Sequence, residues 1–178
     1  MERLTLAIIN DHADIKDYYA KYTSASGEEK TKFFDIFRWK LATHTVSEEL
    51  LLHPAFTNAG LDGALKDSEA HSMLKSELTK LDSLDAISGE SIAKAIYESI
   101  LIHFNDEETM DLPELEGKLS ETESHNLFMR FDRTRVAFVE GIANPPAERP
   151  FATTAALFST PSEKVREIFT AQLGTAMK

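Results

Sequence analysis

The sequence predicts an all-α protein, an up-down-up-down four-helix bundle with one or two extra helices at its C-terminal end. Glycine and proline are scarce, at 7 and 6 of 178 residues. They fall between long stretches rich in Lys, Glu, Leu and Ala, which favour helix. No stretch alternates between polar and apolar residues as a half-buried strand would. In addition, one pattern of histidine and glutamate occurs twice at a fixed separation.

Composition excludes several classes of site. The chain has no cysteine, which rules out disulfides, thiolate metal ligands and iron–sulfur clusters. The net charge of −11 argues against a nucleic-acid partner, because phosphate binding needs clustered Lys and Arg. No apolar run approaches the roughly 20 residues that span a bilayer, and the first residues do not resemble a signal peptide. We therefore expect a cytoplasmic protein with neither a membrane nor a nucleic-acid partner; a protein partner is left open.

Turn-forming residues divide the first two thirds of the chain into four predicted helices. Proline lacks a backbone N–H and clashes with the preceding turn, so Pro54 and Pro113 are expected to end the second and fourth of them. The connection between the second and third helices is placed at Pro54–Leu61. The predicted helices run from Leu4 to about Ser24, Glu28 to His53, Asp62 to Leu81 and Glu90 to Met110.

The remainder of the chain is predicted to pack on this bundle. Residues 1–115 are assigned to the bundle and 116–178 to the C-terminal helices and a proline-containing segment. A Ser-x-x-Glu capping box at Ser120 begins a fifth helix that reaches about Ile142. An extended segment follows at 144–150. Thr160, as the N-cap, begins the last helix, which reaches about Leu173.

Two phrases recur along the chain. The first reads His-x3-Glu-Glu-x4-Pro and occurs at His44–Pro54 and His103–Pro113. The second reads His-x3-Lys and occurs at His12 and His71. Each His-x3-Lys histidine precedes the histidine of the following phrase by 32 positions. The chain therefore reads as two helical hairpins related by an offset of 59 residues.

Helix geometry turns this repeat into a predicted metal site. Residues four apart share one face of a helix, so each histidine can reach the same ions as the following glutamate. The midpoints between successive histidines fall in or beside the predicted turns, which places the four histidines in one layer of the bundle. Imidazoles and carboxylates buried there would be costly without a partner. The predicted ligands are His12, His44, Glu48, His71, His103 and Glu107.

Nitrogen and carboxylate donors without sulfur suit iron, manganese or zinc, and two bridging carboxylates suit two ions close together. Glu49 and Glu108 are turned about 100° further round the helix and are expected to face solvent or to support the ligands. Glu108 remains an alternative to Glu107.

Other polar residues receive simpler interpretations. His53 is expected beyond the end of the second helix, and His125 lies outside the repeat, so neither is predicted to bind metal. Lys16 and Lys75 are most simply surface lysines, with a role in gating the site as the alternative.

These residues resemble the hemerythrin-like HHE cation-binding family. The resemblance lies in Asp11-His12, in the run from Trp39 through Leu50, in Glu69-Ala70-His71 with Lys75, and in His103 through Pro113. The C-terminal segment 144–169 is similar to the tail of the soluble single-domain branch. The family implies a non-haem di-iron centre in a four-helix bundle, held by the six residues above.

The resemblance also implies a function class. Oxygen-carrying hemerythrins have a second histidine where this chain has Lys75, so the chain is closer to the iron-handling, sensing and nitric-oxide-related members. We expect a metal-binding protein that binds or reacts with O2, nitric oxide or peroxide. The alternatives are a di-iron oxidoreductase, peroxidase-like or oxygen-activating, and an iron or oxygen sensor read by a partner protein. Catalytic residues are not assigned.

Overall fold

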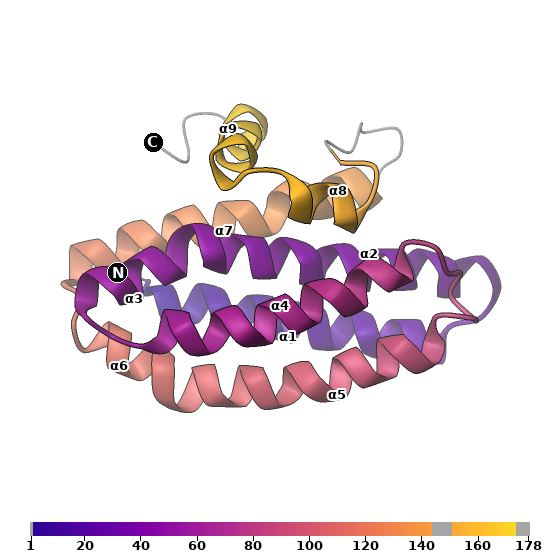
Figure 1. Cartoon of the computed structure of the whole chain (residues 1–178), viewed down its shortest axis with the longest axis horizontal. Helices are drawn as coiled ribbons and strands as arrows, with labels where there is room; N and C mark the ends of the chain where they lie inside the picture. The colour runs from indigo at the N-terminus through magenta and orange to yellow at the C-terminus, as the bar shows by residue number, and fades with distance from the viewer. Residues whose placement is uncertain (1, 144–150, 174–178) are drawn as a thin grey trace.

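The computed structural model describes residues 2–143 and 151–173, and within these ranges the chain forms helices and no strand. Four long helices lie side by side along the long axis of the molecule (Figure 1). They are α1 (Leu4–Ser24), α2 (Gly27–Ser47), α4 (Gly63–Leu81) and α5 (Glu90–Asp106). In the described part of the chain, no helix combines the length and the apolar character needed to cross a bilayer.

Two of the long helices continue through a π-helical turn instead of ending at proline. After α2 come the π-turn η1 (Glu48–Leu52) and α3 (His53–Ala59); after α5 come η2 (Glu107–Asp111) and α6 (Leu112–Glu116). The prediction that Pro54 and Pro113 end these helices is therefore wrong.

The π-turn explains why proline is tolerated. Its last hydrogen bond runs from the N–H of His53 to the carbonyl of Glu48, five residues earlier, and Leu112 donates to Glu107 in the same way. Each proline then stands in the first turn of the α-helical segment that follows, where its missing N–H leaves no helical bond unmade. Such turns are frequent at functional sites, and here each begins at a glutamate of the repeated phrase.

The connection between the two helical hairpins, which joins α3 to α4, therefore lies later in the chain than predicted. The helix ends at Ala59, and Gly60 takes the left-handed conformation (φ 71°) that closes it. The midpoint between His44 and His71 therefore falls inside α3, and counting symmetrically about the turn is wrong for this pair. His53, predicted to lie beyond the helix end, is instead the first residue of α3.

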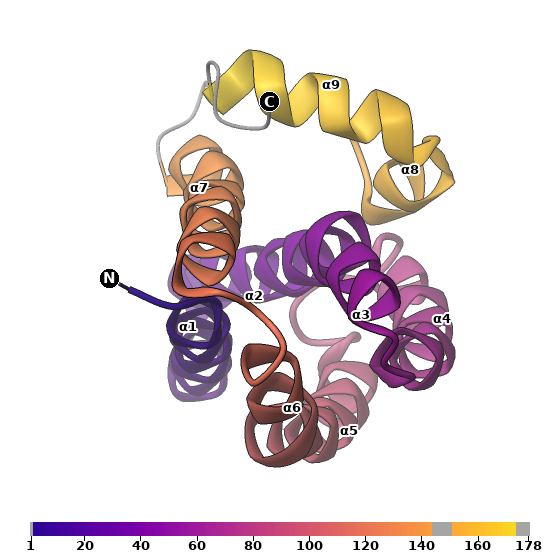
Figure 2. The ribbon, with the colours of Figure 1, turned by 90° about the vertical axis from the view of Figure 1, so that its left-hand side faces the viewer.

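The chain after the bundle packs against α1, α2 and α4. Helix α7 (Glu121–Ala143) contacts α1 and α2, while α8 (Thr154–Ser159) contacts α4 and α2. Seen end-on, α7, α8 and α9 (Ser162–Leu173) lie on one side of the molecule, and α5 and α6 lie on the opposite side (Figure 2).

The capping box that begins α7 is confirmed, because Ser120 and Glu123 exchange side-chain and backbone hydrogen bonds. Helix α8 was not predicted. Asp82 anchors its first turn by accepting hydrogen bonds from the backbone of Thr154 and Ala155. Thr160 ends α8, and α9 begins at Ser162. The extended segment predicted at 144–150 lies outside the described residues.

Glu116, at the end of α6, joins three helices at one end of the bundle. Its carboxylate accepts hydrogen bonds from the backbone N–H and hydroxyl of Thr5, from the Ser124 hydroxyl and from the Arg3 guanidinium. Burial raises the pKa of Glu116, but these four donors outweigh burial and hold the pKa below its usual value. The carboxylate therefore stabilises the fold most when it is ionised.

We expect Glu116→Gln to lower the free energy of unfolding by about 1 kcal/mol at pH 7, because partial exposure reduces the roughly 1.5–3 kcal/mol that hydrogen bonds to a charged group contribute. A carboxyl whose pKa is lower in the folded state stabilises above its unfolded pKa and loses that effect on acidification. The difference should therefore shrink below about pH 4. Urea unfolding across pH measures it, with the exposed neighbour Glu114→Gln as control. An equal effect in the control would contradict this role.

Candidate metal centre

Six side chains from four segments converge in the middle of the bundle. Glu48 lies between two histidines, with carboxylate oxygens 3.3 Å from Nε2 of His44 and 3.2 Å from Nε2 of His71. Glu107 lies between the other two, 3.3 Å from Nε2 of His12 and 3.7 Å from Nε2 of His103. Each glutamate thus joins one histidine of its own helix to one histidine of another.

The convergence forms two overlapping sets of donor atoms, each set within 4.8 Å. One set is His12, His44, Glu48 and Glu107, and the other is Glu48, His71 and His103. A further set joins Asp67 to His103 and Glu107. Two neighbouring positions therefore have the nitrogen and carboxylate donors that first-row transition metals accept.

These donor atoms are buried and lack hydrogen-bond partners in the described chain. The atoms are Nε2 of all four histidines and both carboxylate oxygens of Glu48 and Glu107. Polar atoms buried in this way usually have a partner, since each unsatisfied atom costs free energy. Cations would satisfy all of them together, so the donor set fits bound metal.

The pKa shifts of the site also indicate that bound cations would stabilise it. Burial raises the pKa of Glu107 well above its usual value, and the nearby carboxylates of Glu48, Asp67 and Asp111 raise it further. Burial alone lowers the pKa of His71, but the adjacent carboxylates of Glu48 and Glu49 outweigh burial and raise that pKa to about 9. Burial lowers the pKa of His103 to about 4. Bound cations would relieve the repulsion among the carboxylates.

The outer ring nitrogens of three histidines face carboxylates. Nδ1 of His12 donates to Glu108 (2.8 Å), and Nδ1 of His44 donates to Asp11 (3.0 Å). Nδ1 of His71 lies 3.5 Å from Glu49. A carboxylate at Nδ1 keeps the proton there and directs the Nε2 lone pair inward.

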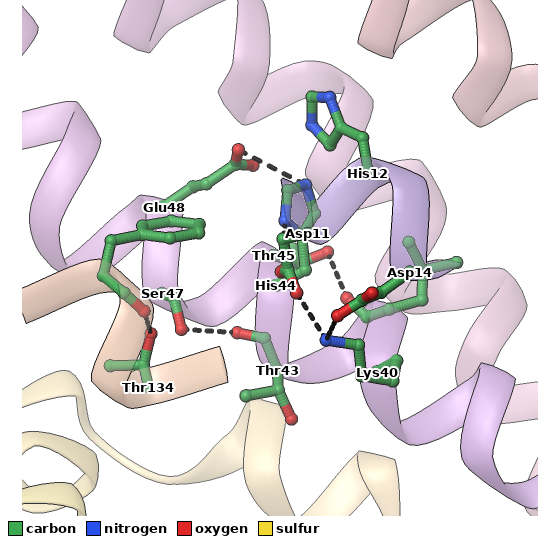
Figure 3. Close-up of polar contacts among 12 residues, drawn as sticks. Asp11, His12, Asp14, Lys40, Thr43, His44, Thr45, Ser47, Glu48 and Thr134 are labelled. Atoms are coloured by element: carbon green, nitrogen blue, oxygen red, sulfur yellow. Dashed lines mark hydrogen bonds and ion pairs between the residues drawn. The ribbon is translucent and has the colours of Figure 1, made fainter. Parts of the chain in front are cut away.

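A lysine backs each of these carboxylates. Lys16 lies near Glu108, Lys40 pairs with Asp11, and Lys75 pairs with Glu49. Of the three pairs, Lys40 and Asp11 are the buried one. Figure 3 shows Lys40 and His44, which both contact Asp11. The lysines predicted as surface residues or gates thus hold the carboxylates that orient the histidines.

The structure brings together all six residues predicted from the repeat and distinguishes Glu107 from Glu108. Glu107 points to the centre of the site, whereas Glu108 contacts the outer nitrogen of His12. Asp11 was not predicted to have a role; it is buried and contacts Lys40 and His44 of α2.

His53 and Asp67 were also not predicted to lie near the site. The ring of His53 stacks on His71 at 5.3 Å, and its Nε2 lies 3.8 Å from Asp67. The added residue of the π-turn places His53 on this face. His125 lies elsewhere, donating to the carbonyl of Glu2.

Comparison with known proteins assigns the family. The chain is 34% identical to an uncharacterized hemerythrin-like protein of Schizosaccharomyces pombe, over 177 positions that cover 94% of this chain and 87% of the yeast protein. The chain belongs to the hemerythrin-like family. No family model matches this hemerythrin-like chain, and no solved structure matches it.

The geometry of this hemerythrin-like site predicts different outcomes for two adjacent glutamates. Glu107→Gln should remove a central donor and abolish binding at one metal position. Glu108→Gln leaves the central donors in place, so affinity should fall by about 10–100-fold, as expected when a partner of a ligating histidine is changed. Titration against a competing chelator measures both, with the exposed Glu69→Gln as control. Stronger loss in Glu108→Gln would reverse the two assignments.

Proposed function

We propose that this chain is a non-haem di-iron protein that binds or reacts with O2, nitric oxide or peroxide. Two iron ions would lie in an up-down-up-down four-helix bundle. The proposed ligands are His12, His44, Glu48, His71, His103 and Glu107. The observation that carries the proposal is the convergence of eight buried, unpaired donor atoms from four histidines and two glutamates. Membership in the hemerythrin-like family supports iron as the metal.

Each proposed position has a similar set of donors. His12 and His44 would hold one ion, His71 and His103 the other, and Glu48 and Glu107 lie between the two pairs. Two nitrogens and shared carboxylates leave coordination positions for a small molecule. Iron, when bound, would supply electron transfer and the affinity for diatomic ligands.

The chain itself orients the donors and covers the half of the site that contains His12 and His44. Asp11, Glu49 and Glu108 fix three imidazoles through their outer nitrogens. Phe104 stacks on His12 with ring centroids 3.7 Å apart, and it also meets His44 edge-on. Exclusion of water slows side reactions of a bound small molecule.

Two cavities in the described part of the chain differ in whether they reach the proposed ligands. The larger cavity, about 430 Å³, lies among residues of α3, α7 and α9, such as Ala55, Leu127 and Arg166. None of the six proposed ligands lines it. A smaller cavity of about 290 Å³ reaches His103. A large substrate bound in the larger cavity would therefore not touch the metals.

Metal content tests the proposal directly. Protein expressed in iron-replete medium should carry about two iron ions per chain, the number expected of carboxylate-bridged bundle sites. His44→Ala together with His103→Ala should abolish binding, because one donor is lost from each position. His125→Ala, at a histidine outside the site, is the control and should retain the metal. Elemental analysis that finds no metal in the parent protein would refute the proposal.

The optical spectrum of the reduced protein should show which small molecules bind at the metal. We expect its optical spectrum to change on addition of nitric oxide, O2 or peroxide, because each position retains open coordination. A stable oxygen adduct would indicate a carrier, and rapid consumption of peroxide would indicate an oxidoreductase. A spectrum unchanged by all three would contradict binding of these ligands at the metal.

A further inference from the structure

The two halves of the site differ at one pair of positions. The 59-residue offset pairs Glu49 with Glu108 and Lys16 with Lys75, and both pairs are conserved between the halves as carboxylates and lysines. The same offset pairs Asp11 with Ala70 and Lys40 with Ser99. The buried Asp11–Lys40 pair that supports His44 therefore has no counterpart at His103.

This difference leaves His103 less covered than the other three histidines. Its side chain is 14% exposed, whereas those of His12, His44 and His71 are 0–1% exposed. Its neighbouring carboxylates are those of Glu48, Asp67 and Glu107, with which it shares two sets of donor atoms. Ala70 and Ser99 are too short to fill the space that Asp11 and Lys40 fill in the other half.

A cavity occupies this place. It measures about 290 Å³ and is lined by His103, Ala70 and Ser99, together with Asp67, Ile102, Asp106, Met110 and Asp111. Ile102 and Met110 are 68% and 56% exposed, so the cavity reaches the surface. It therefore connects solvent to the ring of His103.

The additional helices cover the opposite half. Phe131 of α7 meets the ring of His44 at 6.1 Å, and α7 packs along α1 and α2. Helices α7, α8 and α9 lie on the side away from α5 (Figure 2). The half that contains His12 and His44 is thus closed by both the Asp11–Lys40 pair and α7.

From this asymmetry we infer that small molecules reach the metal centre through the Ala70–Ser99 opening and bind at the position held by His71 and His103. The inference rests on the proposed function. The cavity, at about 290 Å³, admits a diatomic ligand with room to spare. The net charge of −11 and Asp106 at the opening disfavour anions, so the ligand is uncharged, as nitric oxide and O2 are.

Closing the opening tests the route in the metal-loaded, reduced protein. Ser99→Leu narrows the opening. Ala70→Asp combined with Ser99→Lys introduces the residue types that Asp11 and Lys40 provide in the closed half. Both should slow nitric oxide association by about tenfold or more, since access then limits the rate. Ser91→Leu, the same change at an exposed position of α5, is the matched control. Metal content should be unchanged in all variants.

Unchanged nitric oxide rates in both closed variants, with metal retained, would overturn the inference. A slowing in Ser91→Leu equal to that in Ser99→Leu would also overturn it. Azide, an anion of comparable size, should associate more slowly with the oxidised protein than nitric oxide does with the reduced protein. If the proposed function fails instead, the parent protein contains no metal and gives no nitric oxide signal.

Chemical modification provides a readout that needs no metal. In the metal-free chain, diethyl pyrocarbonate should modify His103 faster than His12, His44 or His71, as resolved by mass spectrometry. Ser99→Leu should reduce modification of His103 to the level of the other three and leave His125 unchanged. Equal reactivity of the four histidines in a chain with native circular dichroism would overturn the inference. If the metal-free chain unfolds, the nitric oxide rates decide.

Discussion

The burial of two glutamates among four histidines is the constraint on which the rest of this structure depends. Glu48 and Glu107 are fully buried, and their carboxylates have no hydrogen-bond donor within the described chain. Such an arrangement costs free energy in an apolar core unless positive charge is present. The helices, their π-turns and the outer carboxylates all act to hold these groups at one level, which is why the arrangement is best explained by bound metal.

The π-turns connect the backbone to the site. Each begins at the central glutamate, so the next residue, Glu49 or Glu108, is directed toward the outer nitrogen of a histidine on another helix. The same turn allows the proline that follows to remain within a helix. The repeated phrase therefore encodes three things together: a pair of central donors, a supporting carboxylate and the local widening that places them.

The two halves of the site have the same repeated phrase but differ in how their histidines are supported. Charge pairs support His12, His44 and His71, while His103 adjoins an open cavity. The additional C-terminal helices increase the difference, because α7 covers α1 and α2 and leaves α5 on the other side. A site built from a repeat thus has two inequivalent halves, and the described cavity reaches only the half that contains His103.

The sequence by itself determined the helical class, the repeat and the six residues that converge, because helix periodicity fixes which residues share a face. It also separated His125 from the site. It did not determine where α2 and α5 end, since proline usually stops a helix and only the widened turn accommodates Pro54 and Pro113. The choice of Glu107 over Glu108 and the support of His44 by Asp11 and Lys40 required the tertiary structure. So did the places of His53 and Asp67 and the opening at His103, because each depends on which side chains of other helices lie opposite.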